Sequence, residues 1–79
     1  MIVASQIRAA RALLRWSARE LAERAGVSLN TIQRMEAVEG VPASSARSLD
    51  SIQRVFEVAG VEFIPENGGG PGVRLKERP

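Results

Sequence analysis

Apolar residues recur at helical spacing through the first sixty positions of the chain. A stripe at i, i+3 and i+7 predicts a helix over residues 5–14, with Ser5 as its N-cap. A longer stripe predicts a helix that begins near Ser44 or Ser45 and ends at Gly60. The members of the two stripes are Ile7, Ala10 and Leu14, then Leu49, Ile52, Phe56 and Ala59. We expect both helices to bury one face in a shared core.

Two shorter helices are predicted between these stripes. The first begins at Ser17, because Ser17-Ala-Arg-Glu20 has the spacing of a capping box, in which a hydroxyl and a carboxylate each bind a backbone amide. Gly26 ends this helix, since a positive φ costs little only for glycine. Ser28 is the N-cap of the second helix, which we predict over residues 28–37. Its inward-facing residues are Ile32 and Met35.

The last part of the chain, residues 61–79, has a different pattern. Apolar and polar residues alternate over residues 61–64 and 73–76, and a glycine-rich turn separates the two runs. This pattern predicts a β-hairpin, which must pack on helices or on another chain to be stable. The fold class is therefore mainly α: a compact four-helix bundle over residues 1–60 with a C-terminal β-hairpin over residues 61–79 as a candidate dimerisation element.

The composition narrows the chemistry of this domain. The chain has 79 residues and contains no histidine, cysteine or tyrosine. It therefore lacks the usual zinc ligands, thiol nucleophiles and imidazole bases, and we expect no metal, no cofactor and no enzymatic activity. Glu20 and Glu23 are spaced as a carboxylate pair, but charged neighbours make a solvent-exposed face the better interpretation. The glycines near Gly70 are not followed by a Gly-Lys-Ser/Thr sequence or a helix, so they do not form a phosphate-binding loop.

Charge and hydropathy place the chain among soluble proteins. Eleven Lys and Arg against nine Asp and Glu give a net charge of +2, which is only a weak indication of nucleic-acid binding. Arginines interrupt the apolar residues of the N-terminal segment, so we predict no signal peptide, no transmembrane span and no membrane partner. A cytoplasmic location is expected.

The segment from Trp16 to Glu36 resembles a known family. Glu20-Leu-Ala, Ala25-Gly-Val-Ser28, Thr31-Ile-Gln-Arg34 and Glu36 are in register with the lambda-repressor-like, Cro/Xre-type helix-turn-helix of bacterial and phage transcription regulators. The resemblance covers residues 5–60. It implies a lambda-repressor-like bundle that binds double-stranded operator DNA in the bacterial cytoplasm, at the nucleoid, commonly as a homodimer on a palindromic site.

The outward face of residues 28–37 supplies the candidate base contacts. Arg34 suits a bidentate contact with guanine, and Asn30 or Gln33 suits adenine. Leu29 stands where relatives carry a polar base-reading residue, and its methyl groups suit a thymine methyl. At Ala18, relatives often carry a glutamine that holds a phosphate, so here only the backbone N–H remains for that contact.

Further residues are candidates for contacts with the DNA backbone. The predicted phosphate contacts are Ala18, Arg19, Ser28, Thr31, Ser45 and Arg47, with Arg8 and Arg15 as additional candidates. Arg11 and Glu36 have a different role, because each lies beside an apolar stripe and the resemblance places them against each other. We predict that they form a structural ion pair between two helices.

A second function remains open at this point. The chain is also consistent with a protein-interaction module, such as the antitoxin half of a toxin–antitoxin pair. In that case the hairpin would bind a partner protein such as a toxin, and DNA binding would be secondary.

Overall fold

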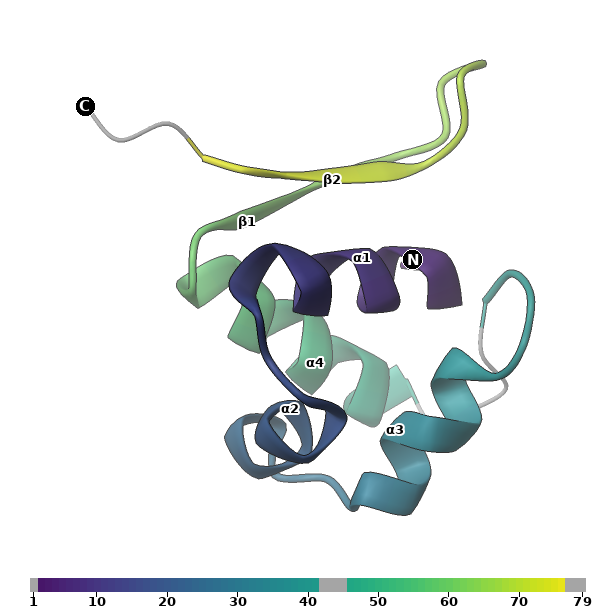
Figure 1. The fold of residues 1–79 in the computed structure, drawn as a ribbon. Helices are drawn as coiled ribbons and strands as arrows, with labels where there is room; N and C mark the ends of the chain where they lie inside the picture. The colour runs from purple at the N-terminus through teal and green to yellow at the C-terminus, as the bar shows by residue number, and fades with distance from the viewer. Residues whose placement is uncertain (1, 42–45, 77–79) are drawn as a thin grey trace.

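Four helices and one β-hairpin follow one another along the chain (Figure 1). The computed structural model describes residues 2–41 and 46–76. Its elements are α1 (Ala4–Leu14), α2 (Ala18–Ala25), α3 (Leu29–Glu36), α4 (Ala46–Val58), β1 (Val61–Ile64) and β2 (Gly72–Leu75). The predicted fold class, a mainly helical bundle with a C-terminal hairpin, is confirmed.

Local capping signals set the ends of the short helices as predicted. The backbone N–H of Glu20 donates to Ser17 Oγ at 3.0 Å, and that of Thr31 donates to Ser28 Oγ at 3.1 Å. Gly26 follows α2 with φ 69°, in the left-handed region. The predicted capping box also required the Glu20 carboxylate to accept a hydrogen bond from the Ser17 backbone N–H. Instead, this carboxylate accepts hydrogen bonds from the side chain of Arg24.

Two predicted helix boundaries are wrong. Ser5 lies inside α1, and the N-cap is Val3, whose backbone N–H donates to Oε1 of Gln6 at 2.9 Å. Ala59 lies beyond α4, which ends at Val58, and it is exposed rather than part of the core stripe. The predicted start of this helix at Ser44 or Ser45 lies outside the described residues.

The core lies where the four helices and β1 meet. Its largest fully buried side chains are Ile7, Leu21, Ile32, Met35, Ile52, Phe56 and Val61. Trp16 is half-buried and stacks on Phe56 with ring centroids 5.6 Å apart, while Phe63 meets Phe56 edge-on at 6.0 Å. Burial of this apolar surface is the main term that favours folding.

The hairpin packs on helices of its own chain. Strands β1 and β2 are antiparallel, with Val61 opposite Leu75 and Phe63 opposite Val73. The buried side chain of Gln6 joins the hairpin to α1, because its amide nitrogen donates to the carbonyl oxygens of Ile64 at 3.1 Å and Gly72 at 3.0 Å. Figure 1 shows the hairpin on the α1 side of the molecule, opposite α2 and α3.

Candidate nucleic-acid interface

The tight turn between α2 and α3 depends on one glycine. The backbone N–H of Gly26 donates to the carbonyl of Ala22, and the N–H of Val27 donates to the same oxygen at 3.1 Å. A Cβ atom on Gly26 would meet no other atom within 4 Å, so the position requires glycine for its positive φ and not for lack of space. The turn leads directly into Ser28, the N-cap of α3.

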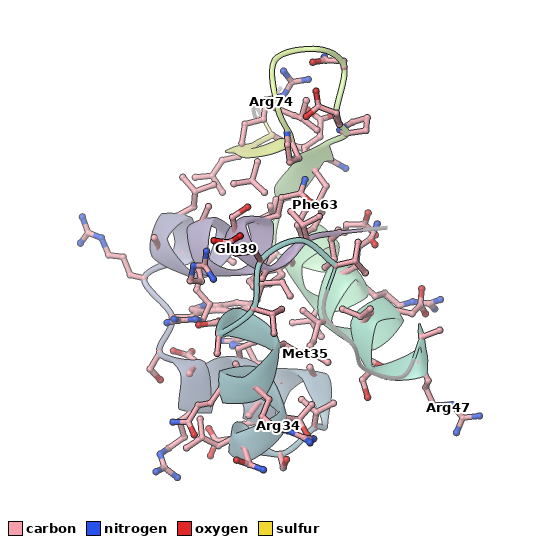
Figure 2. The ribbon with its side chains drawn as sticks, turned by 90° about the vertical axis from the view of Figure 1, so that its right-hand side faces the viewer. Arg34, Met35, Glu39, Arg47, Phe63 and Arg74 are labelled. Carbon is pink, nitrogen blue, oxygen red and sulfur yellow. The ribbon has the colours of Figure 1, made fainter. Side chains whose placement is uncertain are left out.

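Helix α3 presents one apolar face and one polar face. Ile32 and Met35 are 0% and 2% exposed, and they fix the helix on the core. Asn30, Gln33 and Arg34 are all exposed, and within the described residues no intramolecular hydrogen bond or ion pair engages their side chains. In Figure 2, Arg34 lies at the end of the molecule opposite Arg74 of the hairpin. These three side chains are therefore available to an external partner.

Leu29 differs from the other candidate base-contacting residues. It is half-buried and packs against the hydrophobic core, so only part of its side chain faces outward. Ala18 is half-buried in the same way. Both side chains therefore pack on the core, in addition to the DNA contacts that the sequence predicts for these two residues.

The predicted phosphate contacts lie on three elements. Arg19 is exposed in the first turn of α2, and the hydroxyls of Ser28 and Thr31 lie 2.8 Å apart at the start of α3. Arg47 extends into solvent from the first turn of α4, away from Arg34 (Figure 2). Ser45 lies outside the described residues. Among the described candidates, Ser28 and Thr31 therefore lie directly after the turn, Arg19 lies at the other end of α2, and Arg47 lies on α4.

The C-terminal end of α3 is held by α1 through the expected ion pair. Arg11 Nε lies 2.7 Å from one carboxylate oxygen of Glu36, and a terminal guanidinium nitrogen lies 2.8 Å from the other. The remaining terminal nitrogen donates to the carbonyl of Trp16 at 3.0 Å. The hydrogen bond to Glu36 raises the pKa of Arg11 above its ordinary value, while burial acts in the opposite direction. The pair is a two-pronged contact that fixes the angle of α3 against α1.

A second arginine of α1 strengthens this attachment. Arg8 donates to the backbone carbonyl of Glu36, in the last turn of α3. Sequence reasoning considered Arg8 only as a phosphate contact and missed this role. The available signal was its spacing, because Arg8 precedes Arg11 by one helical turn and so lies on the same face of α1.

The described residues offer little for other kinds of site. No group of three or more Asp, Glu, His or Cys side chains among them is arranged to hold a metal ion. None of the described helices has the length and apolar character needed to cross a membrane.

The family model of the helix-turn-helix domain matches residues 2–63. The chain belongs to the helix-turn-helix domain family. The matched residues include α1 to α4 and the first part of the hairpin, and the turn at Gly26 lies within them. Membership in this family indicates a DNA-binding regulator. No curated protein sequence matches the chain.

Proposed function

We propose that this helix-turn-helix protein is a sequence-specific transcription regulator that places its recognition helix, residues 28–37, in the major groove of double-stranded DNA. The observation that carries the proposal is the outward face of α3, where Asn30, Gln33 and Arg34 are exposed while the opposite face is locked in the core. A groove about 12 Å wide accepts such a helix.

Three side chains carry the proposed sequence recognition. Arg34 donates two parallel hydrogen bonds to guanine, and Asn30 and Gln33 pair with adenine, each good pair being worth about 1–3 kcal/mol of discrimination. The outward part of Leu29 contacts a thymine methyl. These contacts lie side by side on one helix, so they read neighbouring base pairs.

Contacts with the DNA backbone orient the protein in this proposal. The N–H of Ala18 at the start of α2 binds a phosphate, as helix N-termini do. The remaining contacts come from Arg19, Ser28, Thr31, Ser45 and Arg47. Since these contacts release counterions, the affinity falls steeply as the salt concentration rises.

We further propose that the protein acts as a homodimer on a palindromic operator. Two recognition helices would then enter successive major grooves about 34 Å apart. The sequence suggests residues 61–79 as the dimerisation element, and this assignment stays a prediction.

The interaction-module alternative rests on the outer strand of the hairpin. Arg74 and Leu75 of β2 are exposed, and Leu75 is 47% exposed although it is a large apolar residue. In an antitoxin, this strand would bind the toxin. Removal of the hairpin is a poor test, because Val61 belongs to the core. The point substitution Leu75→Lys is better, since loss of a partner protein with unchanged DNA affinity favours this alternative.

Selection from a random DNA pool followed by titration of the selected duplex tests the main proposal. Arg34→Ala should weaken binding by about 5–150-fold and relax the preference at one base pair. Arg74→Ala is the matched control for direct DNA contact, because Arg74 lies at the opposite end of the molecule (Figure 2). Its affinity should stay nearly unchanged at protein concentrations where the chain is fully associated. Equal losses for the two variants, or no selection of any sequence, would contradict the proposal.

A further inference from the structure

The outward face of α4 carries charges of alternating sign. Arg47, Asp50, Arg54 and Glu57 are all exposed, on the side of the helix away from the buried stripe. Arg54 pairs with Asp50 at 3.2 Å within the helix, but the two side chains are 74% and 67% exposed. An exposed pair of this kind contributes little to stability and leaves both groups free to bind a second partner.

An exposed apolar residue lies on the same face. Val58, in the last turn of α4, is 85% exposed, the largest fraction among the exposed large hydrophobic residues of the described chain. Beside it, between α2 and α4, an open groove of about 660 Å³ is lined in part by Trp16, Val55 and Ala59. The face therefore combines charged groups with exposed apolar surface at Val58, while the Arg24 guanidinium lies over the Trp16 ring of the groove, 4.4 Å from its centroid.

We infer that α4 docks antiparallel on α4 of a second copy of this chain, and that this contact forms the dimer. The inference rests on the proposed function, in which the protein is a homodimer, and it places the interface on α4 instead of on residues 61–79, where the sequence predicts it. When two α4 helices run antiparallel with these faces in contact, each charged residue lies opposite a residue of the other sign. Asp50 then lies against Arg54 of the second copy, and Arg54 lies against its Asp50. Glu57 lies against Arg47 of the second copy in the same register, and Val58 lies against the first turn of its helix.

The position of α4 sets the symmetry of the inferred dimer. In Figure 1, α4 runs obliquely across the back of the molecule, from a start beside α3 to an end near the hairpin. A two-fold axis perpendicular to α4 and beside its outward face would make the two α4 helices antiparallel, as the charge pairing requires.

Charge also disfavours the hairpin as the contact between copies. The outer strand β2 is followed by Lys76 and contains Arg74, and both side chains are exposed. Arg74 is paired with Glu62 within the hairpin, but pairing of two β2 strands about Leu75 would still bring Arg74 against Lys76, which opposes edge-to-edge association. On the α4 face, Arg47 has two candidate partners, a DNA phosphate and Glu57 of the second copy. The inference therefore depends on the central pair of this face, Asp50 and Arg54.

Two single charge reversals test the inference without DNA. Asp50→Arg places two arginines against each other in every dimer, and Arg54→Asp places two aspartates against each other. In sedimentation equilibrium, each variant alone should associate about tenfold more weakly than the unmodified chain. An equimolar mixture should recover the association, because the arginine introduced in one variant then faces the aspartate introduced in the other across the interface. The helical pair stays broken within each chain, so a purely intramolecular role predicts no recovery.

The hairpin provides the matched control and the contrary outcome. Glu62 and Arg74 form a cross-strand ion pair, so Glu62→Arg and Arg74→Glu repeat the design at β1 and β2. Recovery on mixing the α4 variants, with no effect of the hairpin variants, supports the inference. Recovery only for the hairpin variants, or unchanged association of the α4 variants, overturns it. The variants Arg47→Glu and Glu57→Arg give a second, independent pair if one α4 variant loses its helical circular dichroism. Loss of DNA binding by Arg34→Ala with association intact keeps this result separate from the proposed function.

Discussion

Removal of one partner of the Arg11–Glu36 ion pair should destabilise the domain strongly. Glu36→Gln keeps the size of the side chain but removes the charge that both guanidinium contacts, at 2.7 and 2.8 Å, require. Breaking a fully buried pair costs about 3–5 kcal/mol, and breaking an exposed one costs at most about 1 kcal/mol. The Arg11 and Glu36 side chains are 24% and 12% exposed, which places the pair nearer the buried case. We expect a loss of about 2–3 kcal/mol.

Urea denaturation followed by far-UV circular dichroism and by Trp16 fluorescence measures this loss. A domain of this size has a total stability of about 4–12 kcal/mol, so the variant should show a clear fall in its midpoint. Its Tm should fall by roughly 10–20 °C. Trp16 is a suitable reporter, because its carbonyl accepts a hydrogen bond from Arg11 and its ring stacks on Phe56.

Two further variants make the result decisive. Glu23→Gln removes an exposed carboxylate of α2 and should change stability by less than about 0.5 kcal/mol. The double variant Arg11→Met with Glu36→Leu replaces the pair by apolar groups and should recover part of the loss, because no buried charge is then left alone. A Glu36→Gln variant as stable as the Glu23→Gln control would refute the argument that this pair holds α3 on α1.

Three other outcomes are expected. Gly26→Ala should cost about 1–2 kcal/mol in urea denaturation, because alanine is strained at φ 69°, and a smaller loss for Gly26→Asn would confirm that φ is the cause. Gln6→Leu should cost about 2–3 kcal/mol and speed hydrogen exchange of the hairpin amides, since it removes three hydrogen bonds of a side chain only 4% exposed; unchanged exchange would contradict the clamp. Stability should be nearly flat between about pH 6 and pH 9, because no side chain of the sequence has an ordinary pKa in that window, and a marked slope there would reveal a shifted side chain or a contribution of the α-amino group.

Local signals explain which parts of the fold the sequence could predict. Some features depend only on groups within a few residues, so the sequence alone predicts them. These are the N-caps at Ser17 and Ser28 and the turn at Gly26. The hairpin is predictable for the same reason, because alternation and a glycine-rich turn define it locally. The outward face of α3 follows from helical periodicity once Ile32 and Met35 are assigned to the core.

The features that were missed depend on contacts between distant segments. Gln6, not Ser5, shapes the start of α1, because its amide also binds carbonyls of Ile64 and Gly72, which are 58 and 66 residues away. Arg8 finds its partner only when α1 and α3 approach each other. Ala59 continues the periodicity of α4 but follows the end of the helix, where Gly60 takes φ 101° and the chain turns into β1.

The attachment of α3 has a consequence for how such a protein can change its target. Ser28 fixes the beginning of the helix, and Arg8 and Arg11 fix its end through Glu36, so none of these anchors uses the outward side chains. Asn30, Gln33 and Arg34 can therefore be exchanged without removing any of the contacts that hold α3 on the rest of the domain. Under the proposed function, one scaffold can in this way support a series of variants that prefer different DNA sequences.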